Sequence, residues 1–418
     1  MTAKQPWHVP GKWFAVPTYW EPEVAARRGL RPPRVRFIDC TLREGEDATG
    51  CHLGWTQRLA ITRALDDIGI GEITIPGGAG YREQMDYLRW CKTHGIRAPI
   101  SVKGPGTRVP LRSDWKEVYK RHIDMGGASI VPIVLSEAQD VFNDYSGKVS
   151  KDMVVEAIQE VTAFTKAQGA NIVLSIGDSM RHRLETALLF YGSAVQAGAD
   201  GVYVWDSRGN SHPAATATYV RRLRETIGDK SLYIQFHNDL GLATANCLVA
   251  AENGADWLDA SVLGVADRGG CVALEEAAAA LALYGVETGI KLEKLYDLCK
   301  LVEGAFGVTV QPWKPIAGAV WCMEPGWGHW DEGDSPETPI GIAAEVVGRR
   351  FENVIAPTVF FGRYPTFVGD MLKHWGYSYT EADAAEIVER AKSSVMTHRT
   401  YITLEEFREV CKGVLGIS

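Results

Sequence analysis

Nine consecutive residues, DCTLREGED at 39–47, combine the side chains that acid–base and metal chemistry require. Asp39 directly follows the apolar run VRFI, which has the composition of a buried strand, and Arg43 and Glu44 come soon after it. A carboxylate at such a position can bind a cation or move a proton, and a nearby arginine can stabilise developing negative charge. A solvated charged turn would have the same composition. The surrounding elements must therefore decide between the two interpretations.

Those elements alternate regularly between about residues 34 and 288. Short β-branched runs are separated by longer amphipathic segments, and eight such alternations predict an α/β fold, a (β/α)8 TIM barrel. An open doubly wound sheet is the alternative, but neither GxGxxG nor GxxxxGK[ST] follows the first run. The predicted strands are 35–39, 72–76, 99–102, 129–134, 171–176, 201–206, 232–237 and 257–262.

The barrel prediction places several polar residues around one opening, because the chemistry of such barrels lies at the C-terminal ends of the strands. Asp39, Asp178, Asp206 and His237 each fall at or just after a predicted strand end. Oxygen and imidazole ligands at an open site suit Mg, Mn or Zn. The alternative is that His237 only forms a hydrogen bond at a strand end and that Asp239 caps the next helix.

Two segments together resemble the DRE-TIM metallolyase superfamily, which contains isopropylmalate synthase, homocitrate synthase and hydroxymethylglutaryl-CoA lyase. The first is DCTLREGED, and the second is FHNDLG, which continues toward LGVADRGG. The region after residue 288 resembles the synthase branch. The residues that match the superfamily's two motifs are Asp39, Thr41, Leu42, Arg43, Glu44 and Gly45, and then His237, Asn238, Asp239 and Gly241.

The resemblance implies an acyltransferase. The expected reaction is a metal-dependent Claisen-type condensation of an acyl-CoA, commonly acetyl-CoA, with a 2-oxo acid, which gives a 2-hydroxy dicarboxylic product of the alkylmalate or homocitrate type. A carbon–carbon lyase or aldolase of the same superfamily is one alternative, and a catalytically degenerate binding subunit is another. The implied cofactor is a divalent cation, and the implied partners are small molecules, with no nucleic acid and no membrane.

The resemblance also implies roles for individual residues. Asp39 and His237 are the expected metal ligands, with Gln235 where the family has another histidine. The expected catalytic residues are Arg43 and Glu44, with Glu324 in MEPG and His329 five residues on, where synthases have His-Glu-Ser-Gly. We expect substrate contacts from loops after strands 5 and 6, because guanidinium groups pair bidentately with carboxylates. These substrate-binding candidates are Asp178, Arg181, Ser207 and Arg208.

Composition sets the remaining expectations. The chain has 418 residues and a net charge of −8, which argues against a nucleic-acid-binding protein. No run approaches the roughly 18 apolar residues of a membrane helix, and eight scattered cysteines indicate reduced thiols in the cytoplasm. The expected organisation is an N-terminal extension at 1–33, a catalytic barrel at 34–288, and C-terminal helical subdomains at 289–418 that contribute to a dimer and an active-site lid.

The Trp-rich segment 313–330 generates a prediction about assembly. It is too apolar for an exposed loop and too irregular for a core element, and the synthases that the sequence resembles imply a homodimer. We therefore expect the C-terminal region to cover the barrel opening of a second copy. Analytical ultracentrifugation at micromolar protein should give the mass of a dimer, and a monomer under those conditions would contradict the prediction.

Overall fold

The computed structural model describes residues 6–27, 34–77, 81–136, 149–324, 340–355, 366–398 and 401–417. The chain divides into two compact units. The barrel unit is Val16–Val310, and the second unit combines Met1–Ala15 with Gln311–Ser418. Within the described residues, no helix is both long and apolar enough to cross a membrane.

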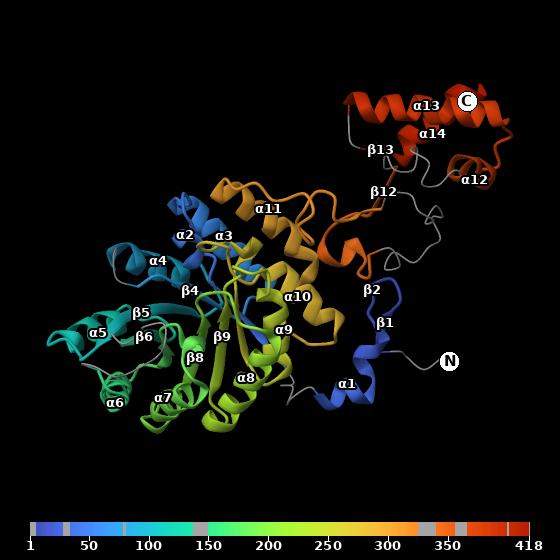
Figure 1. Cartoon of the computed structure of the whole chain (residues 1–418). Coiled ribbons are helices and arrows are strands. Elements are labelled where there is room, and N and C mark those ends of the chain that lie inside the picture. Colours follow the sequence, from blue (N-terminus) through green and yellow to red (C-terminus); the bar gives the residue numbers. More distant parts are fainter. Residues whose placement is uncertain are drawn as a thin grey trace. The chain divides into compact units, whose positions relative to one another are not determined.

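Eight parallel strands of the barrel unit form a closed barrel in the order β10-β3-β4-β5-β6-β7-β8-β9 (Figure 1). The predicted fold class is confirmed, and each predicted strand overlaps one strand of the barrel. Closure places the last strand beside the first, with Ala260 paired to Asp39. The strands are β3 (Arg36–Asp39), β4 (Glu72–Ile75), β5 (Ile100–Val109), β6 (Ile130–Ser136), β7 (Val173–Ile176), β8 (Gly201–Asp206), β9 (Ser231–Phe236) and β10 (Trp257–Ala260).

Helices follow the strands in sequence and surround the barrel (Figure 1). Helix α3 ends at Ile68. The next residue, Gly69, has a left-handed conformation with φ of 86°, as expected for a glycine that terminates a helix. The helices of this unit are α1 (Pro22–Arg27), α2 (Glu44–Asp47), α3 (Trp55–Ile68), α4 (Tyr81–Thr93), α5 (Trp115–Asp124), α6 (Lys151–Ala167), α7 (Leu184–Gln196), α8 (Pro213–Ile227), α9 (Ala243–Glu252), α10 (Leu274–Leu283) and α11 (Leu295–Phe306).

Among its described residues, the second unit contains short strands and three α-helices. Strands β1 (His8–Val9) and β2 (Trp13–Phe14) form a hairpin, and a separate three-stranded sheet has the order β11-β12-β13. Helix α14 begins with a capping box, in which Thr403 and Glu406 exchange side-chain-to-backbone hydrogen bonds. Part of the Trp-rich segment lies outside the described residues. The other elements are β11 (Met323–Glu324), β12 (Glu352–Ile355), β13 (Ile402–Thr403), α12 (Phe367–His374), α13 (Glu381–His398) and α14 (Leu404–Leu415).

Glu72 has a buried carboxyl group near aromatic side chains of the barrel. Glu72, on β4, is only 5% exposed and accepts hydrogen bonds from the hydroxyl groups of Ser101 and Tyr233. The ring of Tyr233 stacks on that of Trp257 with a centroid separation of 5.1 Å. Burial raises the pKa of Glu72 to about 7, because the low-dielectric interior disfavours the charged form more than the two hydroxyls favour it.

This raised pKa predicts a pH-dependent contribution to stability. The folded protein keeps a proton on Glu72 that the unfolded chain releases above its ordinary pKa of 4.5. The contribution of protonated Glu72 to the free energy of unfolding is therefore fully present below about pH 4.5 and is lost as the pH rises through about 7. Since Glu72→Gln is uncharged at every pH, it should match the wild type at pH 4.5 and exceed its free energy of unfolding by about 3 kcal/mol at pH 8.

Denaturant unfolding at both pH values measures this difference. Glu117→Gln is the matched control, because Glu117 is an exposed residue of α5. If the free energies of unfolding of Glu72→Gln and the wild type differ by the same amount at both pH values, the buried carboxyl group of Glu72 does not make stability depend on pH.

Candidate active site

Arg43 is fixed between two carboxylates at the opening of the barrel. It follows β3, immediately precedes α2, and is only 2% exposed. Its Nη1 donates to Glu44 Oε1, and its Nη2 donates to Asp259 Oδ2 on β10 at 2.8 Å. The hydroxyl of Tyr203, on β8, also donates to Asp259. These contacts hold the guanidinium in one orientation, although its Nε is buried without a hydrogen-bond partner.

Glu44 is held in its ionised form. Burial opposes ionisation, but the positive charges of Arg43 and then Lys103 outweigh it, so the pKa of Glu44 lies below its ordinary value. The side chain of Gln235 also favours the ionised form. An ionised carboxylate at this position can act as a metal ligand.

Asp39 occupies a different environment at the end of β3. It is fully buried, and both of its oxygens accept from Thr41: Oδ1 from the backbone N–H and Oδ2 from the hydroxyl, each at 2.9 Å. Thr41 Oγ1 in turn accepts from the backbone N–H of Val262 at 2.9 Å. Burial raises the pKa of Asp39 to about 7, although the hydrogen bonds from Thr41 oppose the shift. The carboxylate of Asp39 therefore organises the first loop of the barrel.

Glu44, His237 and Asp267 form a cluster whose donor atoms all lie within 4.8 Å of one another. His237 Nε2 is 3.9 Å from Glu44 Oε2, and His237 Nδ1 is 3.2 Å from Asp267 Oδ1. Both of these last atoms are buried, but their contact lacks hydrogen-bonding geometry, so neither has a hydrogen-bond partner. Two carboxylates and an imidazole suit a divalent cation, so these residues fit the metal that the sequence implied. Among the described residues, Asp39 is not part of this cluster.

The predicted substrate-binding residues form a second group beside the opening. Asp178 follows β7 with φ of 51° and accepts from Arg181 Nη1 at 2.7 Å and from Arg208 Nε at 3.3 Å. The backbone oxygen of Ser207 accepts from Arg268 Nη2 at 2.7 Å. The charges of Arg181 and Arg208 are thus matched by one carboxylate.

The remaining predicted site residues belong to the second unit of the chain. Glu324 is the last residue of β11, and His329 lies outside the described residues. Glu324 and the cluster around Arg43 belong to different units of the chain.

Sequence reasoning missed four residues that contact Arg43 or its partners: Lys103, Tyr203, Trp205 and Asp259. Each lies on a barrel strand at a position whose side chain faces the interior, as the contacts of Trp205 and Tyr203 with Val131 and Val173 show. The single acid within the apolar strand WLDA gave a usable signal, because a buried carboxylate requires a partner.

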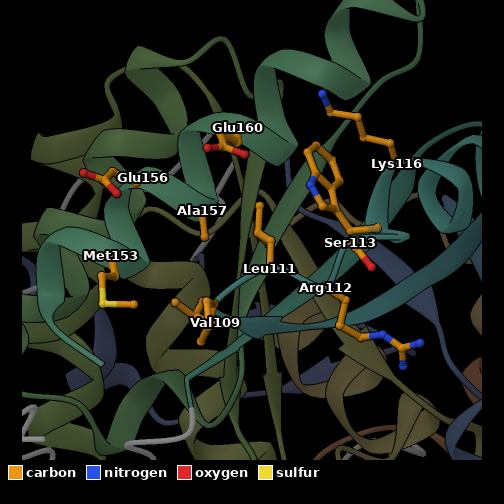
Figure 2. Close-up of a pocket in the computed structure, with 11 residues that line it drawn as sticks. Val109, Leu111, Arg112, Ser113, Lys116, Met153, Glu156, Ala157 and Glu160 are labelled. Atoms are coloured by element: carbon orange, nitrogen blue, oxygen red, sulfur yellow. The ribbon is translucent and has the colours of Figure 1, made fainter. Parts of the chain in front are cut away.

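A pocket with a volume of about 480 Å³ lies elsewhere, between α5 and α6 (Figure 2). Its lining includes Leu111, Trp115 and Met153, with Arg112 and Lys116 at one side. None of the predicted site residues lines it. The cluster of matched charges around Arg43 is the stronger site candidate, because exposed charges alone do not define a catalytic centre.

A closed (β/α)8 barrel with an arginine and a carboxylate–imidazole cluster at its opening defines a class of barrel enzymes with a potential metal site. The sequence profile described as HMGL-like matches residues 34–302, and the protein belongs to this family.

Similar proteins include several synthases. A putative (R)-citramalate synthase of Methanopyrus kandleri is 29% identical over 92% of this chain and 73% of its own length. A homocitrate synthase of Methanocaldococcus jannaschii is 27% identical over 91% of each chain. Among solved structures, the HMG-CoA lyase from Brucella melitensis superposes with a TM-score of 0.54 at 17% identity, over 66% of this chain and 99% of the lyase, which supports the fold.

The cluster predicts which side chains hold a divalent cation. Glu44→Gln, His237→Ala and Asp267→Asn should each weaken binding of Mn²⁺ by at least tenfold, because the two amide variants lose a carboxylate charge and His237→Ala loses the imidazole donor. Calorimetric titration of the metal-free protein measures these affinities directly. Asp39→Asn distinguishes the ligands that the sequence resemblance implies from the cluster of Glu44, His237 and Asp267. Near-normal Mn²⁺ affinity in this variant supports the cluster, whereas a loss as large as that of His237→Ala would make Asp39 a ligand.

Proposed function

We propose that the protein is a metal-dependent acyltransferase that condenses an acyl-CoA, with acetyl-CoA as the expected donor, with a 2-oxo acid. The observation that carries this proposal is the fixed guanidinium of Arg43 next to the cluster of Glu44, His237 and Asp267. The synthase names of relatives that align with 91–92% of this chain support the same reaction type.

In the proposed reaction, the α-carbon of the thioester loses a proton and adds to the keto carbon of the 2-oxo acid. One carbon–carbon bond forms, the keto oxygen takes up a proton, and hydrolysis of the thioester releases the free thiol. A monocarboxylic acceptor gives a 2-hydroxy dicarboxylic acid, and a dicarboxylic acceptor gives a product with one further carboxylate. A bound cation would supply Lewis-acid stabilisation of the keto oxygen, and Glu44, His237 and Asp267 are the residues that would hold it.

Arg43 would stabilise the oxygen of the thioester enolate. Glu44 and Asp259 orient its guanidinium, and the unpartnered Nε–H remains as a donor for a substrate oxygen. Preorganised donors of this kind act where charge develops in the transition state. Glu324 and His329 remain our candidates for acid–base catalysis from the second unit, and Asp178, Arg181, Ser207 and Arg208 remain candidates for substrate contacts. A cytoplasmic homodimer is part of the same proposal.

A thiol-release assay with acetyl-CoA and a panel of 2-oxo acids tests the reaction type. The condensation releases one thiol for each acceptor consumed. A lyase acting in the bond-breaking direction, or a binding subunit without activity, would release none with any acceptor.

The role of Arg43 gives a sharper prediction. If it stabilises the enolate, Arg43→Ala should lower turnover by about 10²–10³, with a smaller effect on KM. Arg43→Lys should fail almost as badly, because a point charge on a flexible stem cannot contact Glu44 and Asp259 as the planar guanidinium does. Steady-state kinetics and thermal melting of both variants check this. Near-normal turnover of Arg43→Lys, with stability lost only in Arg43→Ala, would assign Arg43 a structural role.

A further inference from the structure

Two positive charges lie over one indole ring at the opening of the barrel. Lys103 Nζ, from β5, is 5.4 Å from the centroid of the Trp205 ring, and the guanidinium carbon of Arg43 is 5.6 Å from the same ring. Trp205 belongs to β8, so side chains from separate parts of the barrel wall meet here. Contact of cations with an aromatic face is favourable, but two like charges near one ring also repel each other.

Lys103 differs from the other cations around the opening because no carboxylate pairs with it among the described residues. Arg43 is paired with Glu44 and Asp259. Arg181 and Arg208 share Asp178, and Arg268 is paired with Asp239 and Asp267. Burial, followed by repulsion from Arg43, lowers the pKa of Lys103. Glu44, Asp47 and Asp259 oppose this shift from a distance, but none of them forms a salt bridge with Lys103. An anion placed beside Lys103 would supply the close ion pair that no described carboxylate forms.

Trp205 adds an unused hydrogen-bond donor at the same place. The residue is 8% exposed, and its Nε1 is buried with no hydrogen-bond partner. Gln235 pairs with Trp205 in the register of β8 and β9, and its Nε2 also has no partner at hydrogen-bonding geometry, although its side chain is close enough to favour ionised Glu44. Buried donors without partners are rare in native proteins because each costs its full desolvation free energy.

We propose that Lys103 and Trp205 bind a carboxylate group of the acceptor, so that they determine specificity for the 2-oxo acid. This inference rests on the proposed function, because it assigns the acceptor to the same opening. A carboxylate has several acceptor positions and no donor, so one such group can accept from the ammonium and from the indole N–H at once. Charge-assisted hydrogen bonds of this kind are about twice as strong as neutral ones.

Isothermal titration with pyruvate and with 2-oxoglutarate tests the proposal on the full-length protein, with Mn²⁺ present and again with EDTA. Lys103→Met keeps the apolar stem and removes the charge, and it should weaken binding by about 10- to 100-fold. Trp205→Phe keeps an aromatic face and removes the N–H, so a loss of about three- to tenfold is expected. Lys103→Arg restores a cation and should bind more tightly than Lys103→Met.

Comparison of the two acids shows which carboxylate Lys103 and Trp205 bind, because pyruvate has only the carboxylate next to the keto group and 2-oxoglutarate also has a distal one. A loss of equal size for pyruvate and 2-oxoglutarate in Lys103→Met assigns the pair to the carboxylate next to the keto group. A loss confined to 2-oxoglutarate assigns it to the distal carboxylate of a dicarboxylic acceptor. Either result supports the proposal.

The chain offers a matched control on its outer surface. Lys116 Nζ lies 5.6 Å from the ring centroid of Trp115, a similar lysine–indole contact, and both residues line the separate pocket of Figure 2. Lys116→Met removes an equal charge from an equivalent contact and should leave the affinity for both acids unchanged. Thermal melting of all variants shows whether a loss of affinity merely follows a loss of stability.

The proposal is overturned if the wild type binds neither acid, or if Lys103→Met and Trp205→Phe bind both acids within twofold of the wild type. It is also overturned if Lys116→Met loses as much affinity as Lys103→Met. Thiol release by the wild type is measured separately. Release of thiol without any effect of Lys103→Met on binding refutes this inference alone, and weakened binding in a protein that releases no thiol refutes the proposed reaction alone.

Discussion

The contact between Arg43 and two carboxylates is the constraint on which the opening of the barrel depends. A guanidinium that is 2% exposed is tolerated only when its charge is matched at close range, and Glu44 and Asp259 provide that match from opposite ends of the barrel sequence. Tyr203 then fixes Asp259. The same arrangement keeps Glu44 ionised at 3.9 Å from His237, so the buried ion pair also fixes the charge of one candidate metal ligand.

Charge matching extends outward from this centre. Asp178 pairs with two arginines, and Arg268 connects Asp239 with Asp267. These partly exposed pairs contribute little stability individually, but they hold the loops after β7, β8 and β9 in fixed positions. Lys103 is the exception in this pattern. An opening lined by such pairs presents little uncompensated charge, so the place where a charge is left over has unusual weight for recognition.

The fold was predictable from the sequence because β-branched runs and amphipathic segments follow each other with regular spacing. Arg43 and Glu44 were predictable as site residues because their motif is contiguous. The partner of Arg43 was not predictable. Asp259 lies 216 residues further along the chain, and a single carboxylate in WLDA does not indicate which cation it pairs with. Asp39 illustrates another limit. Side chains alternate along a strand, but the alternation stops where the strand ends, and Thr41 engages both oxygens of Asp39.

Closure of the barrel also has a consequence for the order in which the protein matures on the ribosome. Strand β3 emerges early from the ribosome. Its neighbour β10 is synthesised more than 200 residues later, since Arg36 of β3 pairs with Trp257 of β10. Until then β3 has a free edge, and Arg43 lacks Asp259. Such distant pairings slow folding, since the entropy of closing a long loop must be overcome before any contact is gained. The ion pair between Arg43 and Asp259 therefore forms only after β10 has been synthesised, and a nascent chain that stops before β10 has an exposed strand edge that favours aggregation.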